Sequence, residues 1–330
     1  MITKSAIAPR ASDVYVEPSL TNFSQKLMQD ADNFVAGRLF PSVPVVKQSG
    51  KYFNYDADDL RRIEVKERAP NTEVQVAGFR VATDPYDCKQ WALGRDVDEE
   101  MVANADVPIR PFTDATQYLT HQFMLHKEQI VTSRIFKANT WTTTGVQGAK
   151  WDDYGNANSN PIVDIRDTKR AIQDITGIKA NRLVLGREAY DKLVDHPLIL
   201  DRVKGGATTM NPALVMKERL AHLFELEQVE VADAIHTTSN RGKSKANTTR
   251  ARFVTDKAVL YHAPMSVSLG TPTAASFFSW TQFSGANEEG VRIEVMPIHH
   301  RYTDRVSGRS AYDFKVCSPD LGAYWGDTNG

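Results

Sequence analysis

Gly242-Lys243-Ser244 is the short fragment that comes nearest to a chemical site, because phosphate-binding loops end in this way. Such a loop also needs a glycine five positions before Gly242, so that its backbone can wrap around the phosphates. Position 237 is threonine, and the residues after Ser244 do not have a helical pattern. The sequence therefore predicts no nucleotide site at this position.

The same stretch contains a cluster of cations, with no acidic residue from Ser239 to Arg252. Three interpretations remain open: contact with DNA phosphates, a solvated loop, or a cationic rim that meets an acidic neighbour. No aromatic residues interleave with the cations to stack on bases, which argues against the first. The members that we regard as a DNA-facing or rim loop are Arg241, Lys243, Lys245 and Arg250.

The sequence supports metal binding and covalent catalysis even less than it supports contact with phosphates. His299 and His300 are neighbours on an expected strand and would point to opposite faces, so we expect one surface and one buried histidine. Cys88 and Cys317 are too few for a disulfide framework, lack metal-ligand spacing and are expected to be reduced thiols. No H-E-x-x-H, C-x-x-C, G-x-S-x-G or G-x-G-x-x-G motif occurs. We therefore expect no enzyme, no cofactor and no metal.

The composition sets broader limits. The chain of 330 residues is long enough for two ordinary domains, and 41% hydrophobic with 25% charged residues is typical of a folded protein. Forty cations against 41 anions give a net charge of −1. A protein that gathers nucleic acid through its own charge needs a basic surplus, so this balance argues against that role. We find no signal peptide at the N-terminus and no apolar run of membrane-spanning length.

Residues 151–205 contain the most specific series of structural signals. Asn160 is placed to cap a helix that begins at Pro161, and Gly177 is placed to end it. A short apolar strand is predicted at 183–186 and a second helix at 187–194. His196-Pro197 then breaks that helix, and one or two further helical turns follow.

This order of elements resembles the A-domain of tailed-phage major capsid proteins that have the Hong Kong 97 coat fold. The similarity lies in residues 160–165, 181–193 and 196–204. Asn160 stands where the family pattern usually has aspartate, and asparagine keeps the same capping chemistry. The resemblance implies an α+β fold of the Hong Kong 97 type, with an N-terminal arm, an extended β-hairpin loop, a P-domain with a long spine helix, and an A-domain.

The first hundred residues fit the same order. Residues 1–18 are interpreted as an extended arm and 19–39 as a helix. Residues 45–93 predict a long hairpin, with a first run at 52–55 and a second at 74–81, that is too narrow to have its own core. Aromatic residues on such a hairpin need cover, so we interpret it as an arm that becomes ordered against a neighbouring subunit. A mobile surface loop is the alternative.

Residues 109–137 predict one helix of roughly 40 Å, at about 1.5 Å per residue, which corresponds to the spine helix. Asn211-Pro212 is expected to open a later helix, followed by a strand at 229–231, a polar loop at 236–252 and a strand at 258–261. Apolar and charged residues alternate at 291–295 and at 312–316. These two runs predict an antiparallel ribbon that turns at Ser307-Gly308.

The resemblance divides the chain into five segments. They are an N-terminal arm and helix (1–44), the extended-loop hairpin with P-domain strands (45–108), the spine helix (109–150), the A-domain (151–290), and further P-domain strands with the C-terminal segment (291–330).

Acidic and basic residues are almost balanced in the extended loop. Charges of this kind set the register between two subunits more than their affinity. The alternative is a solvated set of weak ion pairs. The residues that we expect at the subunit interface are Lys51, Tyr52, Phe53, Tyr55, Arg61, Arg62, Glu64 and Lys66.

The resemblance implies a structural head protein of a tailed double-stranded DNA phage, which assembles through hexamers and pentamers into an icosahedral shell. Its partners would be copies of itself, scaffolding, portal and decoration proteins, and packaged DNA bound with little specificity; no membrane is expected. Assembly would occur in the host bacterial cytoplasm and end in the virion capsid. Because fold signals begin by about residue 19, we expect no large maturation cleavage. An encapsulin-type compartment shell and a soluble α/β enzyme remain alternatives.

Overall fold

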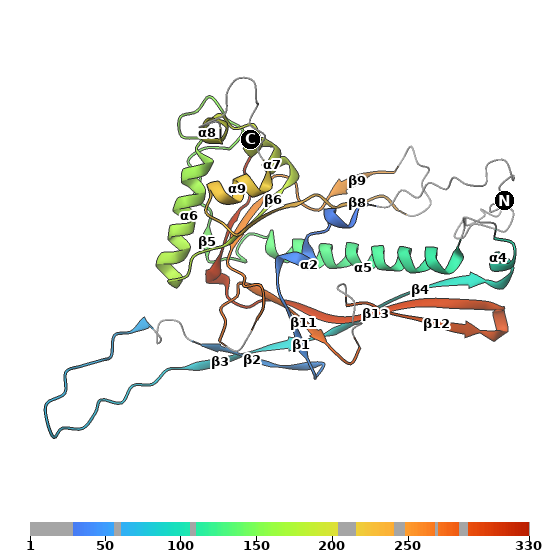
Figure 1. Ribbon diagram of the computed structural model, residues 1–330, viewed down its shortest axis with the longest axis horizontal. Coiled ribbons are helices and arrows are strands. Elements are labelled where there is room, and N and C mark those ends of the chain that lie inside the picture. Colours follow the sequence, from blue (N-terminus) through green and yellow to red (C-terminus); the bar gives the residue numbers. More distant parts are fainter. Residues whose placement is uncertain are drawn as a thin grey trace.

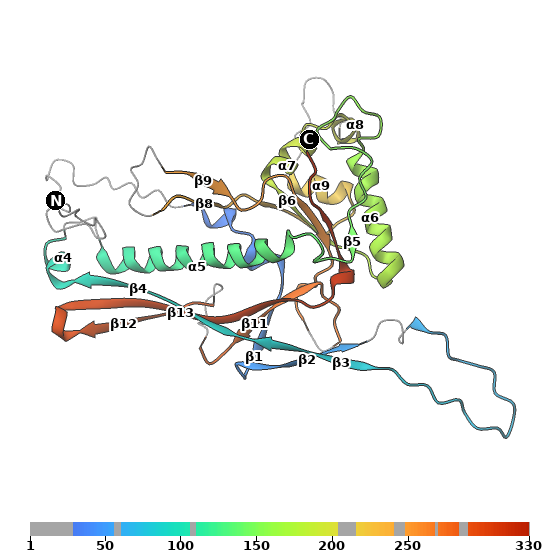
Figure 2. The same ribbon diagram turned by 180° about the vertical axis from the view of Figure 1, so that it is seen from behind.

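The computed structural model describes residues 29–55, 61–105, 110–203, 216–240, 248–267, 270–283 and 290–329. Within these ranges the chain combines two five-stranded sheets with one long helix and several shorter ones. The molecule is elongated. The long helix and the first sheet follow its length, whereas the second sheet and its helices lie at one end, from which a loop also projects (Figures 1 and 2).

The first sheet is organised around β13 (Thr303–Val316), which pairs along one edge with β4 (Lys89–Asp98). Along its other edge lie β12 (Arg292–Ile298) and β11 (Ala275–Trp280), and β1 (Ser42–Val45) adds to β11 in parallel. An antiparallel ribbon of β12 and β13 is therefore confirmed, but the run at 312–316 pairs with β11 and not with 291–295. A short helix, α4 (Glu99–Ala103), follows β4.

The turn of this ribbon is not where the sequence predicted it. β12 and β13 are joined by the 3-10 turn η4 (His299–Arg301) and by Tyr302, whose φ of 52° lies in the left-handed region. Ser307 and Gly308, although typical of turns, lie inside β13. Both His299 and His300 are exposed, so the prediction of a strand with one buried histidine was wrong.

Helix α5 (Pro111–Ile135), named the spine helix here, lies along the first sheet and confirms the long helix predicted over residues 109–137 (Figure 1). Proline is compatible with the first turn because its missing N–H needs no partner there. Leu119 and Phe123 of the helix are buried. A Cβ at Gly308 would lie 2.6 Å from the Phe123 ring, so the close approach of helix and strand requires glycine at this position.

Replacing this glycine is expected to loosen the contact between α5 and β13. Overpacking of this kind costs about 1–3 kcal/mol, so Gly308→Ala should lower the free energy of unfolding by that amount in urea titrations of the unassembled subunit. Gly155→Ala is the matched control, because a Cβ at Gly155 meets nothing within 4 Å. Equal stability of the two variants would contradict the close packing.

The second sheet has the order β5 (Thr143–Thr144), β14 (Gly322–Trp325), β10 (Ala258–Tyr261), β6 (Arg182–Gly186) and β7 (Gln228–Ala232). The strands predicted around 183–186, 229–231 and 258–261 are thus confirmed. The two-residue strand β5 and the C-terminal strand β14 were not predicted. The short turn η5 (Pro319–Leu321) leads into β14.

Three helices beside this sheet follow the predicted order: α6 (Pro161–Thr176), α7 (Arg187–Val194) and α8 (Pro197–Val203) (Figure 2). The Asn160 side chain accepts a hydrogen bond from the Val163 N–H, and Gly177 ends α6 with a φ of 72°. Both capping predictions are confirmed. None of the helices in the described ranges has the length and apolar character that a bilayer span requires.

One prediction in the following segment needs correction, and another is only partly tested. The ends of the predicted polar loop form a small ribbon, with β8 (Ile235–Thr237) paired to β9 (Arg250–Arg252). The helix expected from Asn211 is described only as α9 (Lys217–Leu223), and residues 204–215 lie outside the described ranges.

The N-terminal segment also differs from its prediction. In place of one helix to residue 39, the chain forms the 3-10 turn η2 (Ala31–Asn33) and the four-residue helix α2 (Ala36–Leu39). The extended backbone of Phe34 separates the two elements, and Asp30, which is also extended, precedes the first. The arm at 1–18 and the first part of the predicted helix lie outside the described residues.

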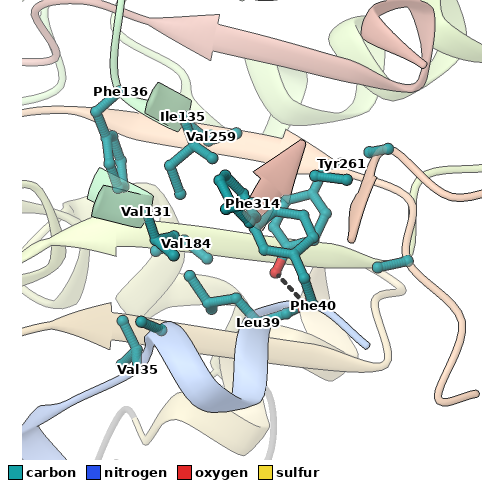
Figure 3. Close-up of a cluster of buried hydrophobic side chains, with 14 of the residues drawn as sticks. Val35, Leu39, Phe40, Val131, Ile135, Phe136, Val184, Val259, Tyr261 and Phe314 are labelled. Atoms are coloured by element: carbon teal, nitrogen blue, oxygen red, sulfur yellow. Dashed lines mark hydrogen bonds between the residues drawn. The ribbon is translucent and has the colours of Figure 1, made fainter. Parts of the chain in front are cut away.

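The two sheets and the spine helix share one buried cluster (Figure 3). Val131 and Ile135 enter it from α5, Val184 and Tyr261 from the second sheet, and Phe314 from the first. Residues 35–40 fill the space between these elements. The junction is therefore a single packed core.

Candidate subunit-interface loop

A hairpin that projects from the first sheet is the most unusual feature of the surface (Figures 1 and 2). Its base pairs β2 (Ser49–Tyr55) with β3 (Val81–Asp87) in antiparallel register. The predicted first strand is confirmed. The predicted second strand begins only at Val81, because residues 72–80 carry no regular pairing in the structure.

Aromatic stacking fixes the base of the hairpin to the body. Tyr52 of β2 and Tyr86 of β3 both stack on Phe278 of β11, with ring centroids 5.2 and 4.9 Å away. Gly50 lies opposite Tyr86, and a Cβ there would meet the tyrosine hydroxyl at 2.6 Å. Burial raises the pKa of Tyr52, and the nearby Cys317 raises it further, so its phenol remains neutral. These contacts hold the hairpin at a defined exit angle.

The distal part of the loop exposes an unusual amount of apolar surface. Ile63, Val65 and Val76 are each 92% exposed, and Val74 is 68% exposed. A turn closes the loop, with the Thr72 N–H bonded to the Ala69 carbonyl at 3.3 Å. Isolated apolar residues on a surface are ordinary, whereas several on one thin projection indicate a contact site.

Val74 and Val76 belong to the second run predicted at 74–81, whereas Ile63 and Val65 were missed because their segment was judged by its high charge content. The signal that identifies them is alternation: Ile63 and Val65 alternate with Glu64 and Lys66, and the same pattern recurs around Val74 and Val76. A period of two is the pattern of a strand with one apolar and one polar face. The loop is therefore suited to lie with one face on a partner.

One contact connects the loop to the second sheet and its helices. The Arg61 guanidinium donates hydrogen bonds to the carbonyl groups of Ile175 and Thr176 at the end of α6. These carbonyls lack partners within the helix, and a cation is favourable beside them. Arg61 thus already has an intramolecular role in the single chain.

The other predicted interface residues divide into two groups. Tyr52 lies against Phe278 of its own chain, whereas Lys51 and Phe53 of β2 are exposed. Arg62 and Lys66 are exposed and Glu64 is half-buried on the distal loop, and Tyr55 ends β2. No contact between subunits tests these residues, and they stay predictions.

The cationic loop is described only at its ends. Arg241, Lys243 and Lys245 lie outside the described ranges, and Arg250 is exposed at the start of β9. Arg252, in the same strand, forms an ion pair with Asp233. Part of the positive charge seen in the sequence is therefore neutralised within the chain.

A serine–histidine pair lies inside the second sheet's helical layer. Ser159 Oγ and His196 Nε2 are 3.3 Å apart, and both residues are 2% exposed. His196 Nδ1 accepts the Leu198 N–H, so the ring proton lies on Nε2 and points at the serine. A base needs a free Nε2 lone pair, so this pair joins two segments and cannot activate the hydroxyl. No cluster of His, Cys, Asp or Glu suited to a metal occurs in the described part of the chain.

Comparison with known proteins decides between the remaining classes. Residues 136–279 match the family described as phage major capsid protein E. The chain is also 24% identical over 227 residues to the major capsid protein of Burkholderia phage BcepMu, which covers 67% of this chain and 70% of the relative. This chain is a phage major capsid protein. The capsid protein thus has a structural role.

Solved structures share the fold of the capsid protein. A phage-related protein from Bordetella bronchiseptica has a TM-score of 0.66 at 19% identity, and covers 91% of this chain and 94% of its own. The capsid of cyanophage P-SCSP1u has a TM-score of 0.61 at 12% identity, and the similarity covers 99% of this chain and 100% of the cyanophage chain. An encapsulin of Synechococcus elongatus is similar at a TM-score of 0.51 and 10% identity, covering 94% and 93%. The fold therefore occurs in both kinds of shell.

Proposed function

We propose that the capsid protein has the Hong Kong 97 fold and tiles as hexamers and pentamers into an icosahedral head around double-stranded DNA. The exposed distal loop is the observation that carries this proposal. The first sheet with α5 corresponds to the P-domain, and the second sheet with α6–α9 to the A-domain. The role is structural rather than enzymatic, and it requires no cofactor or metal.

The loop supports assembly because its apolar residues gain cover only from another chain. Burying a valine or isoleucine side chain contributes roughly 1.5–3 kcal/mol relative to leaving it in water. Ile63, Val65, Val74 and Val76 together provide a substantial contact for each subunit. Many such contacts act cooperatively, since a subunit held by several neighbours is released only when all of them break.

Charged residues of the loop are proposed to select the register of that contact. Arg62, Glu64 and Lys66 flank the apolar residues Ile63 and Val65, Lys51 lies at the base of the hairpin, and both signs of charge are present. Charge complementarity of this kind steers docking and rejects misplaced neighbours. The contact should therefore depend more strongly on salt in its rate than in its final strength.

The near-neutral charge suits a shell that encloses DNA without specific binding. Scaffolding, portal and decoration proteins are the further partners that we propose, with assembly in the host cytoplasm. The loop around Arg241, Lys243, Lys245 and Arg250 would face DNA or form a rim between subunits. A net charge of −1 leaves little general affinity for a polyanion.

Imaging of the purified protein tests the proposal. We expect closed shells of uniform diameter, formed cooperatively as concentration rises, and DNA inside particles isolated from infected cells. An encapsulin-type shell would instead contain a protein cargo. A compact monomer or dimer at every concentration in light scattering would contradict both kinds of shell.

A further inference from the structure

The segment 35–40 is held at its first end by a buried carboxylate from the spine helix. Glu128 Oε2 accepts hydrogen bonds from the N–H groups of Val35 at 3.0 Å and Ala36 at 2.9 Å. The Glu128 side chain has no exposed surface, and its second oxygen has no hydrogen-bond partner among the described residues. Burying a carboxyl group with only one of its two oxygens hydrogen-bonded costs free energy of folding. Its presence at this position therefore suggests a role beyond stability.

The other end of the segment is held from the second sheet. Arg182 of β6 donates from one guanidinium nitrogen to the carbonyls of Arg38 at 3.0 Å and Leu39 at 2.9 Å. The hydroxyl of Tyr261 in β10 donates to the same Leu39 carbonyl at 3.1 Å (Figure 3). Arg182 is itself buried.

Side chains of the segment complete the joint. The Phe40 ring lies 4.6 Å from the Tyr261 ring and 5.4 Å from the Phe314 ring, and so contacts both sheets. Val35 and Leu39 pack into the same buried cluster as Val131 of α5 (Figure 3). Six residues thus touch the spine helix, the first sheet and the second sheet together.

Apolar packing alone would hold these parts together at less cost than two buried polar groups, the Glu128 carboxyl and the Arg182 guanidinium. What their hydrogen bonds add is direction, because each is strong only within a narrow range of distance and angle. Glu128 lies on the spine helix and Arg182 on the second sheet, and they form hydrogen bonds to opposite ends of one short segment. A rotation of the helix relative to the sheet would break the hydrogen bonds at one end or the other.

We propose that residues 35–40 form a pin that fixes the angle between the spine helix and the second sheet, and thereby the curvature of the shell. This inference rests on the proposed assembly into shells. A small change of angle in one tile is repeated at every contact, so it alters the closure of the whole particle.

The test removes the hydrogen bonds at each end of the segment in turn. Glu128→Ala deletes the acceptor, whereas Glu128→Gln keeps its volume and an acceptor oxygen and serves as the conservative rescue. Arg182→Met keeps the apolar stem without the donors. Arg170→Met is the control, because Arg170 is two-thirds exposed on α6. Amide exchange at Val35 and Ala36 is measured on the unassembled subunit, and particle diameters by electron microscopy.

We expect exchange at these two amides to quicken about tenfold in Glu128→Ala and to remain near the native rate in Glu128→Gln. Particles of Glu128→Ala and Arg182→Met should show a broader range of diameters than those of the native chain and Arg170→Met. If Glu128→Ala does not fold, Arg182→Met and Glu128→Gln still provide the comparison of diameters.

Native diameters in both disrupted variants would overturn the proposal, as would unchanged amide exchange. Folded variants that form no particles at all would also overturn it, since the segment would then be needed for assembly rather than curvature. Failure of the native chain to form shells would instead count against the proposed function.

Discussion

Val65→Asp combined with Val76→Asp is expected to abolish shell formation while the subunit remains folded. Both side chains are 92% exposed in the single chain, so charge there disturbs no internal contact. In a shell each aspartate would be buried against a neighbour. Loss of two valine contacts, at about 1.5 kcal/mol each, raises the concentration needed for assembly more than about 100-fold. Buried charge adds to this.

Sedimentation and electron microscopy of the double variant measure this effect, and circular dichroism checks the fold. Met265→Asp is the matched control, because Met265 is 91% exposed but lies outside the loop. If the double variant forms normal shells, the loop does not provide the contact. If Met265→Asp blocks assembly equally, the effect is not specific to the loop.

The second large effect is a loss of subunit stability with rising pH that depends on Glu128. Burial raises the pKa of this carboxyl to about 7, against the opposing influence of the Ala36 and Val35 N–H groups and the Arg38 charge. The folded state thus holds the proton more tightly than the unfolded state does. The contribution of the protonated Glu128 carboxyl to the free energy of unfolding is complete below its pKa in the unfolded state, near 4.5. This contribution is lost as pH rises through about 7.

The shift corresponds to roughly 3 kcal/mol in the free energy of unfolding, lost between about pH 4.5 and pH 8. Glu128→Gln carries no proton to lose, so the stability difference between it and the native subunit should change by that amount over this range. Urea titrations at a series of pH values measure it. Burial lowers the pKa values of His121 and His126, which acts in the opposite direction, but these groups are common to both proteins and cancel. A difference that is flat with pH would contradict the assignment.

Local signals predicted the second sheet's helices well. Asn160, Pro161 and Gly177 specify their positions through backbone chemistry that acts within a few residues, and α6 begins and ends where they indicate. The same holds for α7 and α8 on either side of His196-Pro197. Such signals depend little on the rest of the fold.

Where the prediction failed, distant contacts decide the structure. Gly308 has the local character of a turn residue, yet it lies in β13 because Phe123 of α5 occupies the space above it. Residues 29–39 have helical spacing, yet Val35 and Ala36 end up bonded to Glu128, 92 or more positions away. Spacing along the chain contains no information about such partners.

For the candidate interface, the sequence identified the region but not all of its chemistry. The aromatic run at Tyr52 drew attention to the hairpin, and the structure shows that this tyrosine anchors the base within its own chain. The exposed residues Ile63 and Val65 stand out only once their surroundings are known. Exposure is a property of the fold, and alternation alone does not say which face is covered.

Hydrogen exchange of residues 61–80 in free subunits and in assembled shells tests the central claim most directly. In the free subunit this segment lacks regular pairing and should exchange at nearly the rate of an unfolded chain. In shells we predict that exchange slows by about 100-fold or more, because a neighbouring copy covers the apolar face. Equal exchange in both states would show that no copy covers the loop, and the account would be contradicted.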